Sequence, residues 1–312
     1  MAAILSGSSR TVLRYIRTHW LELVQINLLP FVAIMAILAA EFAIFGALLS
    51  RILAMVEQEQ VESSLYLDVL KFQGLSLLFT LGIGFISAWQ FVRVTRLYLQ
   101  AELNWIGLST PVIIATLMTM LYALGISLIS SLAFIAGVFV IAVPIALIPA
   151  VSDAHPAWGM MAVPLMFAAM AGVVWFACRF AIGLPAAALG ETPDFFKDLW
   201  GISKGETWGY PLRLLGAMVV LSIVLIPVSI IYGFFVFGKI WMDLTAEPGP
   251  SALSPELLRS LFDNLLVGQL LWGAIMQPVT WYFALLTAEC YRRFKAKRSG
   301  DFVAAAPGSV TI

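Results

Sequence analysis

The feature that most constrains this sequence is a series of uninterrupted apolar runs, each about 20 residues long. The runs cover residues 28–50, 71–92, 111–133, 158–180, 213–238 and 264–289. Hydrophobic residues make up 61% of the chain and charged residues only 12%, whereas soluble domains carry about 25% charged residues. Because lipid offers the backbone no hydrogen-bond partner, continuous apolar runs must span as helices, and barrel strands would alternate instead. The sequence therefore predicts an all-α, polytopic transmembrane helix bundle with about six spans.

The domain organisation expected from these runs is simple. Residues 1–298 form a single integral membrane domain, and residues 299–312 form a disordered C-terminal tail. Residues 9–100 and 193–298 share one order of features: an amphipathic segment, a span, an acidic loop, a second span and a basic exit. A loose parallel repeat of these two ranges is therefore an alternative description of the same domain.

One apolar stretch, from Pro111 to Val151, is too long for a single span. As a straight helix rising about 1.5 Å per residue it would be about 60 Å long, twice the hydrocarbon thickness of about 30 Å. We expect it to bend, fold back or divide. The surplus around residues 135–149 would then be a kinked helix extension or a re-entrant segment, and the sequence does not distinguish between these two.

The basic residues predict the orientation, because cytoplasmic loops are enriched in Lys and Arg. If the long stretch crosses once, 14 of the 18 lysines and arginines lie on the cytoplasmic side, and only Arg51, Lys71, Lys239 and Arg259 lie outside. A second crossing would move the basic segment 292–298 out of the cytoplasm. The sequence thus favours an even number of crossings, with both termini in the cytoplasm.

Two amphipathic segments, residues 9–27 and 193–209, are expected to lie parallel to the membrane on its cytoplasmic face. Each has an apolar stripe with a tryptophan and a basic face opposite it. The candidate contacts with anionic lipid or a protein partner, including one arginine at the end of a span, are Arg10, Arg14, Arg17, Arg179, Lys197 and Lys204. Either these helices only anchor the adjacent spans, which is the favoured interpretation, or they form a binding platform.

A carboxylate in the middle of the first span, Glu41, stands out because a charge at that depth is costly unless it is paired or faces the bundle interior. Gln277, next to Pro278 in the last span, is expected at a similar depth and is the candidate partner. A structural hydrogen bond between helices is favoured over a role in carrying protons or substrate.

Residues for catalysis or metal binding are scattered. His19 and His155 are the only histidines, and neither has partners at the spacing of a metal site. Cys178 and Cys290 are both expected at the reducing cytoplasmic side, so no disulfide is predicted. The phosphate-loop and nucleophile-elbow motifs do not occur. We therefore expect no enzyme activity, no cofactor and no nucleic-acid partner.

A segment of about 35 residues in the second half of the chain resembles a known group. The matching residues are Arg179, Pro185, Glu191, Trp200, Ser203, Lys204, Gly205 and Trp208, whereas Leu199 stands where a small hydroxyl residue is usual. The pattern is similar to that of bacterial six-span membrane proteins of the YciC type and of the membrane domain attached to some glycerophosphodiester phosphodiesterases. The resemblance implies a six-span architecture in a bacterial inner membrane, and it carries over no catalytic residue.

These observations lead to two functional hypotheses. The favoured one is a noncatalytic scaffold or accessory protein of the cell envelope that interacts with membrane lipids, chiefly anionic ones, or with a membrane or cytosolic protein. The alternative is a secondary transporter or channel component that uses Glu41 within the membrane. An intramembrane enzyme is the least favoured, because lipid-modifying sites gather several polar groups in one place.

Overall fold

The computed structural model describes residues 7–57, 64–100, 109–147, 156–191 and 255–299, and further positions between 210 and 238. Its helices are α1 (Gly7–Thr18), α2 (Trp20–Glu57), α3 (Ser64–Gln100), α4 (Thr110–Leu147), α5 (Pro156–Ala181), α6 (Gly183–Ala188) and α9 (Pro255–Ser299). No strand occurs in these ranges. The predicted surface helix at 193–209 and nearly all of the tail 299–312 lie outside the described residues.

Five of these helices are long and apolar enough to cross a membrane, counting only described residues. The qualifying segments are Trp20–Ile52, Leu65–Gln100, Thr110–Gly137, Phe167–Ala188 and Val267–Ala296. The predicted sixth span, 213–238, is described in part and contains the shorter apolar helix Leu225–Phe234. The prediction of an all-α, multi-pass membrane protein is confirmed.

Two of the three courses predicted for the stretch from Pro111 to Val151 do not occur in its described part. Through Leu147 it belongs to one continuous helix, α4, and neither divides nor folds back in the described part. Its length is not exceptional, since α2, α3 and α9 have 38, 37 and 45 residues. At about 1.5 Å per residue such helices exceed the hydrocarbon thickness of about 30 Å, so their ends extend beyond it. Extra length therefore needs no break in the helix.

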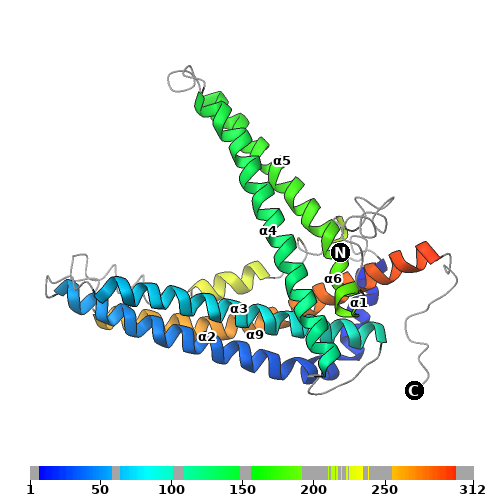
Figure 1. Ribbon diagram of the computed structural model, residues 1–312, viewed down its shortest axis with the longest axis horizontal. Helices are drawn as coiled ribbons and strands as arrows, with labels where there is room; N and C mark the ends of the chain where they lie inside the picture. Colours follow the sequence, from blue (N-terminus) through cyan, green and yellow to red (C-terminus); the bar gives the residue numbers. More distant parts are fainter. Residues whose placement is uncertain are drawn as a thin grey trace.

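The helices form two arms that diverge from one end of the molecule (Figure 1). In the first arm α2, α3 and α9 lie side by side, and in the second α4 and α5 form an antiparallel pair. We call the end where the arms meet the junction; it consists of α1, α6, the C-terminal ends of α3 and α5, Tyr210, Leu214 and α9 from Trp281 onward. The opposite end of the first arm, between Glu57 and Ser64, is the distal end.

Among the described residues, most of the buried apolar side chains lie at the junction, and a smaller cluster joins Ile126 of α4 to Phe180 of α5. The main cluster combines Val12 of α1, Leu23 of α2, Leu97 of α3, Cys178 of α5 and Leu285 of α9 with Ile182, which precedes α6, and with other buried apolar residues. Along the arms, large apolar side chains such as Tyr66, Leu78, Phe167 and Phe234 are exposed. This distribution suits a membrane protein, because lipid is as apolar as a leucine side chain and arm surfaces need no protein cover.

The first amphipathic segment is shorter than expected. The predicted helix over 9–27 ends at Thr18, the chain bends at His19, and Trp20 already begins the spanning helix α2. Val12, on the apolar stripe of α1, is fully buried in the junction core, and α1 packs against α9. Protein therefore covers the part of the apolar face of α1 around Val12, whereas Leu13 on the same stripe remains 44% exposed. The pattern alone could not distinguish cover by protein from cover by lipid.

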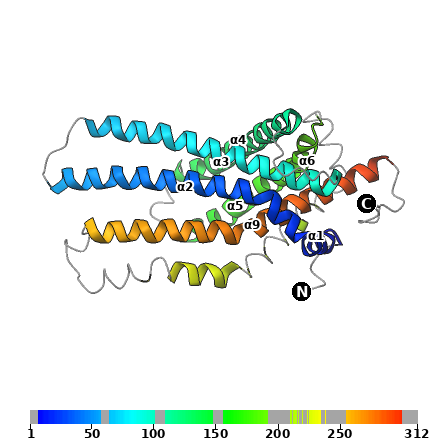
Figure 2. The same ribbon diagram turned by 90° about the horizontal axis from the view of Figure 1, so that it is seen from below.

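The course of the chain between α6 and α9 bears on the number of crossings. Helix α6 ends at the junction, whereas α9 begins at the opposite end of the first arm (Figure 1). Tyr210 contacts Thr287 near the junction, and Tyr232 contacts Trp272 farther along, with ring centroids 5.4 Å apart. These two contacts place the segment antiparallel to α9, beside which Leu225–Phe234 lies in Figure 2. The arrangement agrees with a sixth crossing.

We expect both termini to lie on the same side of the membrane and the 58–63 loop on the other. A reporter active only in the cytoplasm, fused to either end, should be active, and the same reporter inserted at 58–63 should be inactive. Activity at one terminus alone would mean an odd number of crossings and would contradict the antiparallel placement of Tyr210 and Tyr232 on α9.

Candidate functional site

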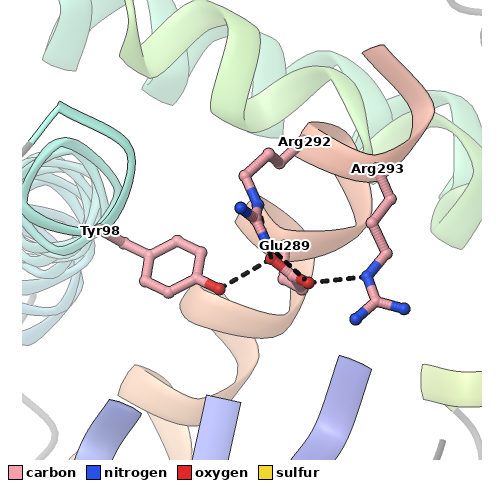
Figure 3. Close-up of polar contacts among 4 residues, drawn as sticks. All are labelled: Tyr98, Glu289, Arg292 and Arg293. Atoms are coloured by element: carbon pink, nitrogen blue, oxygen red, sulfur yellow. Dashed lines mark hydrogen bonds and ion pairs between the residues drawn. The ribbon is translucent and has the colours of Figure 1, made fainter. Parts of the chain in front are cut away.

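The junction is organised around the carboxylate of Glu289, whose side chain is completely buried. The Tyr98 hydroxyl donates a hydrogen bond to it over 2.7 Å. Arg292 and Arg293 donate from their Nε atoms over 2.9 and 2.7 Å (Figure 3). The arginines come from the next turn of the same helix, since side chains three and four residues apart are neighbours on a helix. A buried carboxylate is tolerable only with such donors.

Tyr98 connects this carboxylate to the rest of the junction. It stands near the C-terminal end of α3, so its bond to Glu289 joins α3 to α9. Its ring meets the edge of Tyr15 on α1, with centroids 4.8 Å apart, and Tyr15 stacks on His19. Burial raises the pKa of the Tyr15 hydroxyl, and the negative charge of Glu22 raises it further. The hydroxyl therefore stays neutral. Tyr98 thus links α1 and α3 to the carboxylate on α9.

A second carboxylate, Glu191, fastens the end of α6 to α9. Gly190 adopts a left-handed conformation with φ of 78°, and the Glu191 amide donates to the Ala186 carbonyl over 2.9 Å, which is a Schellman cap. The cap brings Glu191 to the Tyr291 hydroxyl and to Lys295, whose Nζ lies 2.6 Å away. Burial by itself would raise the pKa of the Glu191 carboxyl. The hydrogen bonds from Lys295 and Tyr291 and the positive charge of Lys295 have a larger, opposite effect, so the pKa of Glu191 is lowered.

Three arginines are built into the interior of the junction. Arg93 donates to the Ile26 carbonyl of α2 and lies over the Trp89 ring. Arg96 donates to the Ala188 carbonyl of α6 over 2.9 Å. Arg179 lies 5.3 Å from the centre of the Trp175 ring and is only 6% exposed. The structure therefore differs from the prediction that Arg179 is a surface contact, because its helix ends inside the junction and the side chain is buried there.

The predicted pair of Glu41 and Gln277 does not form. Glu41 accepts a hydrogen bond from the Ser76 hydroxyl over 2.7 Å, and Gln277 instead accepts one from the Gln90 amide. Both partners stand on α3, 14 positions apart, which is about 21 Å along a helix. The two residues were expected at one depth because each lies midway along an apolar run. However, α9 and α2 are offset along their axes.

The remaining predicted site residues fall into two groups. Arg10, Arg14 and Arg17 are exposed on α1, on the side away from buried Val12. Lys197 and Lys204 lie outside the described residues. Among the residues that are described, no group of three or more His, Cys, Asp or Glu side chains could hold a metal ion.

Glu289 was missed by the sequence reasoning, although a signal for it exists. It is an acid followed at three and four residues by two arginines, at the start of the basic segment 292–298. A helix places these three side chains on one face, so the pattern Glu-Cys-Tyr-Arg-Arg predicts an internal ion pair. The apolar run that precedes it could have indicated that the pair is buried.

No protein-family model, curated protein or solved structure matches this chain.

We expect Tyr98→Phe to lower the free energy of unfolding by about 1.5–3 kcal/mol, the usual range for a hydrogen bond to a charged group. Titration with a denaturing detergent in micelles measures this free energy.

Glu289→Gln should also destabilise the protein, and a double-mutant cycle of Tyr98→Phe and Glu289→Gln should show a coupling free energy of about 0.5–3 kcal/mol. Tyr66→Phe, an exposed tyrosine of the same helix, is the matched control and should change stability by less than about 0.5 kcal/mol. Additive effects of Tyr98→Phe and Glu289→Gln would contradict the contact.

Proposed function

We propose that this chain is a noncatalytic, lipid-interacting scaffold or accessory protein of a bacterial inner membrane, with the junction on the cytoplasmic side. The observation that carries the proposal is the exposure of Arg10, Arg14 and Arg17 on a helix whose opposite face is fixed to the junction core. A rigidly held basic face beside a membrane attracts anionic headgroups, with about 1 kcal/mol from each basic residue near the surface.

The charge distribution between the two ends supports this orientation. The junction carries the arginines of α1 together with Arg292, Arg293 and Lys295 of α9, and these basic residues outnumber their two acidic partners, Glu289 and Glu191. At the distal end, the described basic residues Arg51 and Lys71 both pair with Asp68. An excess of positive charge at one end is typical of the cytoplasmic side.

Polar groups within the spans favour a scaffold over a transporter. The Gln90–Gln277 and Glu41–Ser76 hydrogen bonds each join two neighbouring helices of the first arm. They lie about 21 Å apart along α3 and do not converge on one place, as the groups of a substrate site do. Transport through Glu41 is the second candidate, because this carboxylate is only partly buried and still lies within a spanning helix.

Membership of the YciC-type group is also a proposal. Of the residues that carry the resemblance, Arg179, Pro185 and Glu191 lie close together in the chain, at the end of α5, in α6 and directly after it. They belong to the part of the junction that fastens the second arm. A structural role for this motif agrees with a noncatalytic function.

The test measures which lipids the protein retains. Protein purified in mild detergent is mixed with equal amounts of phosphatidylglycerol and phosphatidylcholine, and bound lipid is counted by native mass spectrometry. The variant Arg10→Gln/Arg14→Gln/Arg17→Gln should lose most of the preference for phosphatidylglycerol. The matched control, Arg51→Gln/Lys71→Gln, removes two charges at the distal end and should keep it.

Two outcomes would contradict the proposal. Equal retention of both lipids by the unaltered protein would mean that its basic face does not select anionic headgroups. An unchanged preference in the triple variant would leave α1 as an anchor only. Glu41→Gln keeps a hydrogen-bonding group but removes the titrating carboxyl, so a loss of proton-coupled transport in this variant would favour the second candidate.

A further inference from the structure

An open groove with a volume of about 640 Å³ runs along the second arm, between α4 and α5. Its described wall on α4 is a single stripe that includes Ala123, Ser127, Ser131 and Ile135, at the three- and four-residue steps of one helix face. On α5 the wall includes Val173 and Ala177. The short side chains of alanine and serine leave the space that larger residues would fill.

The pairing of the two helices fixes how the groove is oriented. Phe180 clusters with Ile126, and Gly137 approaches Ala169, so α4 and α5 are antiparallel (Figure 1). Ala123 therefore marks the junction end of the groove and Ile135 the far end. The 12 positions between them correspond to about 18 Å along a helix axis.

The surroundings of the groove determine which kind of molecule can fill it. Most of its described wall belongs to the candidate membrane spans Thr110–Gly137 and Phe167–Ala188, and the wall is mainly apolar. In the hydrocarbon region an open apolar groove is filled by hydrocarbon and not by water. Its volume falls within the range of about 300–1,000 Å³ typical of small-molecule sites. One lipid chain lying lengthwise fits this shape.

A positive charge stands at the junction end of the groove. Leu214 lines the groove there, and Arg213 is its neighbour in the chain. The Arg213 guanidinium lies near Cys290, the residue after Glu289, so it stands at the level of the basic junction. An arginine at this level suits the phosphate of a lipid whose chain extends into the arm, since guanidinium groups bind phosphate with two parallel hydrogen bonds.

We propose that the groove between α4 and α5 binds one acyl chain of a membrane phospholipid, with the lipid phosphate beside Arg213. This site is separate from the exposed arginines of α1, and it selects a lipid by shape along the chain as well as by charge. It stands on the groove and does not require that α1 bind lipid.

The experiment uses a phosphatidylglycerol that carries a photoreactive diazirine in the middle of one acyl chain. The full-length protein is reconstituted with a small fraction of this probe, illuminated and digested, and labelled peptides are identified by mass spectrometry. Labelling should be concentrated on α4 around Ser127–Ile135 and on α5 around Val173. Labelling no stronger there than on the lipid-exposed face of α3 around Leu77 and Leu78 would overturn the proposal.

Substitutions on neighbouring positions of one helix provide the matched control. Ser127→Trp and Ser131→Trp fill the groove, and both positions are exposed, so the fold should tolerate them. Leu128→Trp places the same side chain on a position that is 62% exposed and not among the groove residues. Labelling of Val173 should be lost in both serine variants and retained in Leu128→Trp. Equal labelling in all three would contradict the site.

Two further measurements separate the parts of the proposal. An excess of unlabelled phosphatidylglycerol should compete with the probe better than a free fatty acid does; equal competition would overturn the contact between phosphate and Arg213. The variant Arg10→Gln/Arg14→Gln/Arg17→Gln should still label the groove. If this variant labels the groove and also keeps the preference of the unaltered protein for phosphatidylglycerol over phosphatidylcholine, the function proposed for α1 fails and the groove site stands.

Discussion

A buried carboxylate needs hydrogen-bond donors in place of water, and the rest of this structure depends on how those of Glu289 are supplied. Its own helix supplies Arg292 and Arg293, but the third donor, Tyr98, has to come from α3. Once Tyr98 is held there, its ring positions Tyr15 and therefore α1. Breaking one partner of a buried charge is far more costly than losing a surface pair. The first and last helices of the described chain are thereby fixed to each other.

The arms can be understood from this arrangement. The second arm joins the first through α6 and the inner part of α4, where Arg96 binds the last carbonyl of α6 and Glu191 binds Lys295. Beyond these contacts α4 and α5 pack mainly on each other. Lipid can cover their outer faces without the penalty that water would impose. A protein built this way has a closely packed junction and long arms whose outer faces lipid can cover.

Much of the architecture was predictable from the sequence, because apolar runs and the distribution of arginines report directly on the bilayer. The all-α class and the position of most spans follow from them. What could not be predicted depends on the offset between helices. Glu41 and Gln277 each lie within an apolar run, yet they face different levels of α3. Similarly, no pattern along α1 or α5 shows that Val12 and Arg179 are covered by protein.

Hydrogen exchange of the α1 amides in lipid nanodiscs tests most directly whether the buried Glu289 carboxylate organises the junction. If α1 is docked on α9 through Tyr15, Tyr98 and Glu289, its amides should exchange as slowly as those of α9 around Tyr291. In the Glu289→Gln variant, exchange in α1 should become faster while exchange at the distal end of α2 stays the same. Fast exchange of α1 in the unaltered protein, with no further change in the variant, would contradict this account.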